Sequence, residues 1–248
     1  MGIAHSSLEC DINQLIHWTK QGDIEQLEKN LQEKRFKKAL NEPDSDGWTA
    51  LHWAASFKSS TIPILLKHGA NLHLKDNDGC TPLHLTCRHS KTKGTKVLIN
   101  AGANVNEEDK FKRTPLHRAA RFGTNSCTKM LIIAGAEVDH LDKDNRTPLF
   151  FACQSRRSDN VSVLLYHDAF VNAFDIHGES PYTIIEKSKG KGGSTRILKL
   201  FDKANPDKSS VPSLKQLCRT FILKDKDTIN NDSIQLPGDL YSYLGISQ

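Results

Sequence analysis

The chain has 248 residues, of which 37% are hydrophobic and 25% are charged, with a formal net charge of +5. These values are typical of a soluble protein, and no apolar run approaches the roughly 20 residues that a membrane helix needs. The N-terminus lacks the basic and apolar stretches of a secretory signal, so we expect a cytoplasmic or nuclear location. Its first six residues fit the loose N-myristoylation pattern at Gly2, without a polybasic second signal.

The first predicted elements are two helical stretches between Ile12 and Leu31, separated by the turn residues Gly22 and Asp23. Many charged residues occur in and after this segment (Glu25, Glu28, Lys29, Glu33, Lys34, Arg35). The pattern predicts a degenerate capping repeat over residues 1–41, with one face in contact with water.

From residue 42 onward the sequence repeats, with a hydroxyl residue at each predicted helix start: Thr49, Thr81, Thr114, Thr147 and Ser180. The intervals are 32, 33, 33 and 33 residues, and Pro follows four of the five starts. A hydroxyl can cap free backbone N–H groups, and Pro is favoured at the first helical position. Residues 42–205 are therefore predicted to form helix-turn-helix repeats.

An apolar second helix follows in each unit, and Gly69, Gly102 and Gly135 are placed to end it in the left-handed conformation. Turn residues such as Asp46-Gly47 and Asp78-Gly79 lead into the next start. The predicted fold is an all-α solenoid of about six repeats, in which the first and the last are irregular.

The stretches DGWTALHWAA, DGCTPLHLTC, FKRTPLHRAA and DNRTPLFFAC resemble the ankyrin consensus. The resemblance implies that His52, His84 and His117 tie neighbouring repeats together through backbone hydrogen bonds, rather than binding a metal. Cys87 and Cys153 fall where other repeats have Ala, so we expect small packing residues. No nucleophile stands out from the repeat positions, and we expect a non-enzymatic protein without a cofactor.

After a polar linker at residues 206–212, residues 213–248 form a different pattern. An amphipathic helix is predicted there, since Leu214, Leu217, Cys218 and Ile222 share one face. This tail resembles a SOCS box, the module that ends the ankyrin-repeat and SOCS-box family. The resemblance implies elongin B and C as partners, with contacts to elongin C through Ser213, Leu214, Leu217, Cys218 and Ile222.

A second part of the tail resembles the cullin-contacting stretch of the same family, through Leu236, Pro237, Leu240 and Tyr243. It departs from the family pattern because Gly238-Asp239 follows Pro237 and the second proline of that pattern is missing. Recruitment of a cullin and its RING subunit is thereby left open. An alternative reading of the tail is a helix that only caps the last repeat.

Ankyrin arrays bind partners through turn tips and inner helices, where aromatic and arginine side chains are the usual hot spots. The candidate groove residues are Trp48, Phe57, Arg88, Phe111, Arg113, Arg121, Phe122, Arg146 and Arg157. Basic residues outnumber acidic ones between Lys110 and Arg157, which predicts an acidic or phosphorylated protein segment as ligand. An ordinary solvated face is the alternative, and a net charge of +5 without base-stacking platforms argues against nucleic acid.

The leading functional hypothesis is the substrate-recognition subunit of an elongin-BC cullin-RING ubiquitin ligase, with the target protein held in the ankyrin groove. The alternative is an ankyrin adaptor or inhibitor without ligase function. The identity of the target protein does not follow from the sequence.

Overall fold

The computed structural model describes residues 2–190 and 192–204, with side chains from Ser7 onward. The chain divides into two units, residues 1–204 and residues 205–248. The predicted tail falls in the second unit, outside the described residues. All the predicted elongin and cullin contacts also lie outside the described residues: Ser213, Leu214, Leu217, Cys218, Ile222, Leu236, Pro237, Leu240 and Tyr243.

Helices are the regular secondary structure of the described residues, which contain no strand, so the all-α prediction is confirmed for this part of the chain. The N-terminal group is α1 (Gly2–Gln21), α2 (Ile24–Asn30) and α3 (Lys34–Ala39). Five helix pairs follow. Their first members, here called inner helices, are α4 (Ala50–Ser56), α6 (Pro82–Arg88), α8 (Pro115–Phe122), α10 (Pro148–Gln154) and α12 (Pro181–Lys187).

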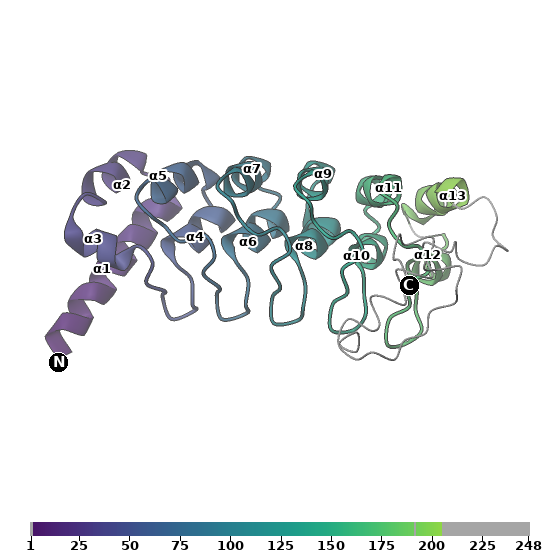
Figure 1. Ribbon diagram of the computed structural model, residues 1–248, viewed down its shortest axis with the longest axis horizontal. Coiled ribbons are helices and arrows are strands. Elements are labelled where there is room, and N and C mark those ends of the chain that lie inside the picture. The colour runs from purple at the N-terminus through teal and green to yellow at the C-terminus, as the bar shows by residue number, and fades with distance from the viewer. Residues whose placement is uncertain (1, 191, 205–248) are drawn as a thin grey trace, which may run out of the picture. The chain divides into compact units, whose positions relative to one another are not determined.

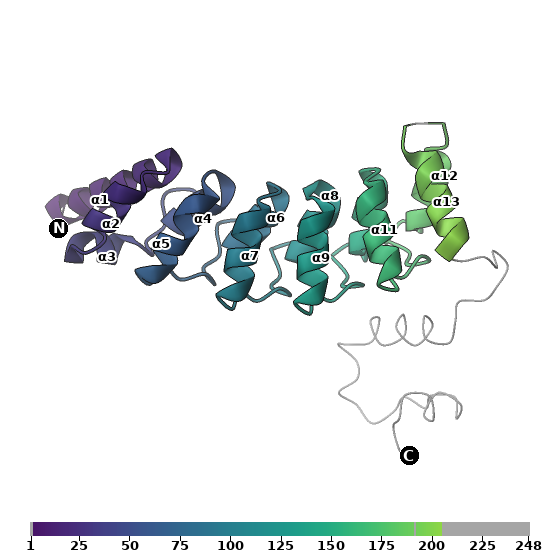
Figure 2. The ribbon, with the colours of Figure 1, turned by 90° about the horizontal axis from the view of Figure 1, so that it is seen from above.

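The second member of each pair is an outer helix, and in Figure 1 the outer helices form a second row above the inner ones. They are α5 (Ile62–Lys67), preceded by the 3-10 turn η1 (Ser59–Thr61), α7 (Thr92–Asn100), α9 (Asn125–Ile133), α11 (Ser158–Tyr166) and α13 (Ser194–Ala204). Figure 2 shows the pairs following one another side by side from α4/α5 to α12/α13. No helix in the described ranges has the length and apolar character to cross a membrane.

Each inner helix begins at the hydroxyl residue that the sequence predicts as its cap. At Thr49, Thr81, Thr114 and Ser180 the cap is reciprocal, since the side chain three residues later also accepts from the backbone N–H of the capping residue. Thr147 caps α10 through its side chain alone. A capped first turn matters here because seven- or eight-residue helices are too short to be stable by themselves.

One apolar core runs through the stack. The leucine two residues after each of the first four starts is buried, as is the central leucine of each outer helix from α5 to α11: Leu51, Leu83, Leu116, Leu149, Leu65, Leu98, Leu131 and Leu164. Full burial of such a side chain stabilises the fold by about 2 kcal/mol. Because each helix pair buries its leucines against its neighbours, a single pair would not fold alone.

The N-terminal cap contains one more helix than the sequence analysis predicted. Helix α3 occupies the charged segment after α2, and it buries Phe36, Ala39 and Leu40 while its charged residues remain exposed. The Phe36 ring packs edge-on against Trp18 of α1 at 5.2 Å between ring centroids. These residues extend the main core at its N-terminal end, in a segment whose many charged residues gave no sign of a buried helix.

A short loop precedes each inner helix and projects from the inner row (Figure 1). These finger loops are residues 44–48, 76–80, 109–113, 142–146 and 175–179. Backbone N–H groups of Lys110, Lys143 and Ile176 donate to the preceding finger loop at 3.0, 3.0 and 3.1 Å, so the later loops are joined tip to tip. The loops thus form a continuous edge beside the inner helices.

Candidate binding groove

An aspartate occupies the first position of every finger loop: Asp44, Asp76, Asp109, Asp142 and Asp175. In each loop its Oδ1 accepts the backbone N–H groups two and four residues further on, at 2.8–3.0 Å. One carboxylate oxygen therefore fixes the shape of each loop. The other oxygen, Oδ2, remains able to accept hydrogen bonds from side chains.

The partner of Oδ2 comes from the inner helix in two of the units. Trp53 Nε1 donates to Asp44 Oδ2 at 2.7 Å, and Arg118 Nη2 donates to Asp109 Oδ2 at 2.6 Å. Trp53 and Arg118 occupy the same place, four residues after the helix start. In these two units the finger loop and the inner helix that follows it are thereby tied together beside the predicted groove.

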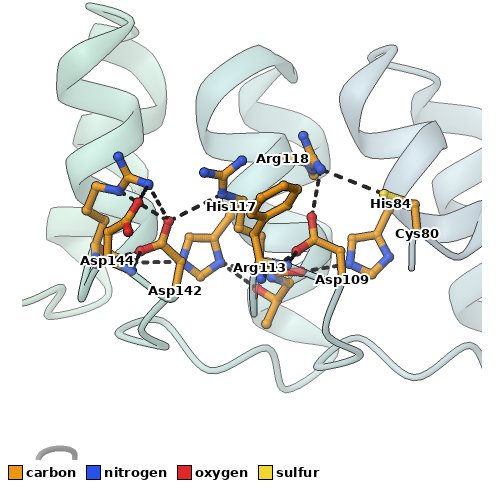
Figure 3. Close-up of polar contacts among 11 residues, drawn as sticks. Cys80, His84, Asp109, Arg113, His117, Arg118, Asp142 and Asp144 are labelled. Atoms are coloured by element: carbon orange, nitrogen blue, oxygen red, sulfur yellow. Dashed lines mark hydrogen bonds and ion pairs between the residues drawn. The ribbon is translucent and has the colours of Figure 1, made fainter. Parts of the chain in front are cut away.

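The fourth unit has Phe151 at that place, and a phenyl ring cannot donate a hydrogen bond. Asp142 Oδ2 instead accepts from Arg113 Nε at 3.3 Å and from Arg146 Nη2 at 3.1 Å (Figure 3). Burial is the largest single influence on the pKa of this carboxyl, and it favours the neutral form. The hydrogen bonds from the Arg146 backbone and side chain outweigh burial and hold the pKa of Asp142 below its ordinary value.

Three guanidinium groups surround the Phe151 ring, whose residue is only 2% exposed. Their central carbons lie 5.2 Å (Arg113), 5.7 Å (Arg121) and 5.2 Å (Arg146) from the ring centroid. These distances are within the range of cation–π attraction. We call Arg113, Arg121 and Arg146 the arginine cluster.

Arg121 differs from the other two arginines in the cluster, because it forms no ion pair with any acidic side chain in the described ranges. Its guanidinium instead lies over Phe122, at 4.9 Å, as well as over Phe151. Burial, and then the positive charges of Arg113 and other nearby arginines, lower the pKa of Arg121 below its ordinary value. The cluster therefore holds a cation whose charge is not compensated locally.

Three buried histidines join the repeats beneath the groove. The Nε2 atoms of His52, His84 and His117 lie 3.1, 2.9 and 3.1 Å from the backbone carbonyls of Cys80, Arg113 and Arg146 in the next finger loop. In each case Nδ1 accepts the backbone N–H of the capping threonine, so Nε2 carries the proton. The predicted structural role of these histidines is confirmed.

The N-terminal end of the groove is aromatic rather than basic. Trp48 and Trp53 have ring centroids 4.7 Å apart, and Phe57 stacks on Trp53 at 5.4 Å. The ammonium group of Lys20, in α1, lies 3.4 Å from the centroid of the Trp53 ring. This aromatic cluster adjoins Cys80 and Leu85 of the next unit through Trp48.

Comparison with known proteins gives a family match. The family described as "Ankyrin repeats (3 copies)" matches residues 15–109 and 95–175, which together exceed half of the chain. This chain belongs to the ankyrin-repeat family. Protein-protein interaction is the activity that such repeats indicate.

Two curated relatives are similar to part of this chain. "Protein phosphatase 1 regulatory subunit 27" of Homo sapiens is 36% identical over 69 residues, and the protein of the same name from Mus musculus is 35% identical over 69 residues. Each match covers 27% of this chain and 44% of the relative. The chain therefore spans less than half the length of the curated relatives that it matches.

The ankyrin framework brings some of the predicted groove residues together. Arg113, Arg121 and Arg146 meet at Phe151, while Phe111 and Phe122 each flank one of these arginines. Trp48 and Phe57 belong to the aromatic cluster, at the other end of the groove.

Two predicted groove residues lie outside both clusters. Arg88 is exposed, at the end of α6. Arg157 precedes the outer helix α11, and it lines a polar pocket of about 480 Å³ with Arg156, Thr124, Ser158 and Phe122. Arg121 and Arg157, both predicted groove residues, therefore occupy different settings in the ankyrin array.

The prediction omitted three residues that contact the finger loops or the arginine cluster: Trp53, Arg118 and Phe151. All three stand four residues after a helix start, so the repeat alignment could have identified them. They were missed because this position of the repeat resembles a core position of the inner helix. The buried free thiols of Cys87 and Cys153 are packing residues, as predicted, and burial raises their pKa values far above that of an exposed cysteine.

Proposed function

We propose that this protein is the non-catalytic substrate-recognition subunit of an elongin-BC cullin-RING ubiquitin ligase. In this proposal the ankyrin groove holds an acidic segment of a target protein, in the cytoplasm or nucleus. The tail would bind elongin C. Such a subunit contributes proximity, because it raises the local concentration of target near the ubiquitin-transferring machinery.

The arginine cluster is the observation that supports the groove half of the proposal. Arg113 and Arg146 share one carboxylate, and Arg121 has none. The side chains of Arg113 and Arg146 are each only 18% exposed, so much of the desolvation cost of binding has already been met within the fold. Guanidinium groups held in place in this way favour carboxylate or phosphate partners.

A binding assay on the full chain tests the groove. Short degenerate peptide mixtures with a central Glu-Glu pair are compared with the same mixtures carrying Gln-Gln, by fluorescence anisotropy. We expect tighter binding of the Glu-Glu mixture and a loss of about tenfold in affinity for Arg121→Ala, which corresponds to about 1.4 kcal/mol. Arg157→Ala is the matched control, since Arg157 lies outside the cluster.

The groove half of the proposal fails if Gln-Gln peptides bind as tightly as Glu-Glu peptides. It also fails if Arg157→Ala weakens binding as much as Arg121→Ala does. Circular dichroism of each variant shows that the ankyrin array is intact. Arg121 donates no hydrogen bond to another described residue, so its replacement should leave the fold unchanged.

The tail half of the proposal is supported by the sequence resemblance of Ser213, Leu214, Cys218 and Ile222 to the elongin-binding pattern. Co-expression with elongins B and C tests it directly. The full chain should co-purify with both elongins, and the double variant Leu214→Ala/Cys218→Ala should not. Equal recovery of elongin C with both proteins would refute the ligase assignment and leave the groove unaffected.

A second candidate function is an adaptor or inhibitor without ligase activity, and the names of the curated relatives favour a phosphatase as its partner. In that case the catalytic subunit of protein phosphatase 1 should co-purify with the chain. The interaction should survive Leu214→Ala/Cys218→Ala, since it would depend on the ankyrin array. Failure to recover the phosphatase under conditions in which elongin is recovered would eliminate this candidate.

A further inference from the structure

We infer that the arginine cluster is a phosphoryl-binding site, which holds a phosphorylated residue of the target segment against Arg113, Arg121 and Arg146. This inference deepens the proposed function and rests on it. It specifies which kind of anion the groove selects and where in the groove that anion sits. Three features support it: the charge balance, the donor geometry and the ring beneath the donors.

The charge balance favours a dianion over a single carboxylate. In the third and fourth units Arg113, Arg118, Arg121 and Arg146 face Asp109, Asp142 and Asp144. Arg121 is the cation left over within the cluster. The exposed Arg88 lies outside the cluster, at the equivalent place in the preceding unit, and its positive charge is one of those that act on Arg121. Two positive charges therefore lack a carboxylate. A phosphate monoester carries a charge of about −1.5 to −2 at neutral pH, which matches this surplus, whereas one carboxylate leaves half of it.

Some guanidinium N–H groups of the arginine cluster form no hydrogen bond with another described residue. Arg113 is bonded to Asp142 through Nε, while its terminal nitrogens donate no hydrogen bond within the described ranges. The guanidinium of Arg121 donates none there either. Each free terminal edge can offer paired N–H groups to a phosphoryl oxygen, a geometry that a lysine ammonium cannot reproduce. A phosphoryl group has three acceptor oxygens, which suits donors arriving from separate arginines.

The Phe151 ring explains why these cations stay close together in the absence of a ligand. Arg113 and Arg146 reach it from two successive finger loops, and Arg121 reaches it from the inner helix α8. Cation–π attraction and the shared Asp142 offset the repulsion among the three guanidinium groups. The site is therefore preorganised, so binding orders few side chains.

Phosphorylated peptides provide the test, on the full-length chain. Short degenerate mixtures carry phosphoserine, phosphothreonine or phosphotyrosine at one fixed position, and matched mixtures carry the unphosphorylated residue or Glu there. We expect at least one phosphorylated mixture to bind ten or more times more tightly than both of its counterparts. Arg121→Lys retains the charge but lacks the planar fork, so it should lose most of that preference, and Arg157→Lys should retain it.

The outcomes separate this inference from the proposed function. If Glu mixtures bind as tightly as phosphorylated ones, the groove takes acidic segments and the phosphoryl site is refuted. The phosphoryl site is likewise refuted if Arg121→Lys retains the full preference, or if Arg157→Lys loses as much. If no anionic mixture binds, both the inference and the groove half of the proposal fail, whereas elongin recovery reports on the tail alone. Circular dichroism verifies folding, and Arg121→Gln provides a second, neutral replacement.

Discussion

Mild acid should destabilise this protein because its inter-repeat histidines must stay neutral. In the folded chain Nδ1 of His84 and of His117 already accepts a backbone N–H, so a proton there would remove the acceptor and break the cap. Burial is the largest cause that lowers the pKa of His84 to about 4 and that of His117 to about 3, from an ordinary value of 6.5. In mild acid these two histidines therefore bind protons in the unfolded chain but not in the folded chain.

The sign and the size of the effect follow from proton linkage. The contribution of these two histidines to stability is fully present above pH 6.5, where both are neutral in the folded and in the unfolded chain. It is lost as the pH falls below 6.5 and continues to fall until the pH reaches the folded-state values near 4 and 3. From pH 7.5 to pH 5.5 each of these histidines lowers the free energy of unfolding by about 1.4 kcal/mol, or about 3 kcal/mol for the pair. Burial lowers the pKa of His52 too, which adds in the same direction.

Urea unfolding followed by circular dichroism at pH 7.5, 6.5 and 5.5 measures this loss. Carboxylates with ordinary pKa values near 4 contribute little in that range. The variant His84→Gln/His117→Gln retains a donor and an acceptor without titrating. It should be less stable at pH 7.5, yet lose about 3 kcal/mol less than the natural chain on going to pH 5.5. The exposed His73→Gln is the control, and an unchanged pH slope in the double variant would refute the reasoning.

Three further predictions concern single side chains. Lys112 has a left-handed backbone (φ 56°) where three other finger loops have glycine, so Lys112→Gly should raise the free energy of unfolding by about 1 kcal/mol in urea titrations. Asn160 is 2% exposed and its amide donates to three carbonyls at the end of α8, so Asn160→Ala should cost about 2 kcal/mol; unchanged thermal melting would contradict this. Asp109→Ala removes the carboxylate partner of the largely buried Arg118 (side chain 13% exposed) and the acceptor of two finger-loop N–H groups, so it should cost about 3 kcal/mol in urea titrations, while the exposed Asp78→Ala should cost little.

The repeat framework could be predicted because each of its signals is local and recurs. A capping hydroxyl, a histidine three residues later and a helix-ending glycine act within one unit or on the next, so their spacing alone identifies them. Where one signal is absent the backbone still adopts the same conformation, as at Asp168, which has φ 59° in the place of Gly69 and Gly102. Periodicity therefore determined the fold more reliably than any single residue did.

The arginine cluster could be predicted only in part, since it depends on differences between neighbouring units. The sequence places Arg113 and Arg146 at equivalent positions of two finger loops, and a regular stack would keep them one repeat apart. It does not show that both would turn to the same carboxylate, or that Arg121 would join them from α8. Helix α3 was missed for a related reason, because Phe36 is buried against Trp18 of α1 rather than by a repeat partner.

The proposed binding site lies where the inner helix does not satisfy the aspartate of its own finger loop. In the first and third units the residue four places after the helix start donates to the aspartate of the finger loop and satisfies its second oxygen. In the fourth unit Phe151 cannot donate, and so Asp142 is free to attract arginines from two finger loops. The same ring then attracts their guanidinium groups, together with Arg121, which has no carboxylate of its own. Leu85 and Ile184 are apolar at the same place in the second and fifth units, so the arginines supplied by the neighbouring finger loops and by α8 matter as much as the ring. Phe151 and Asp142 together concentrate positive charge and leave Arg121 without a carboxylate, which is the condition that the proposed anion site requires.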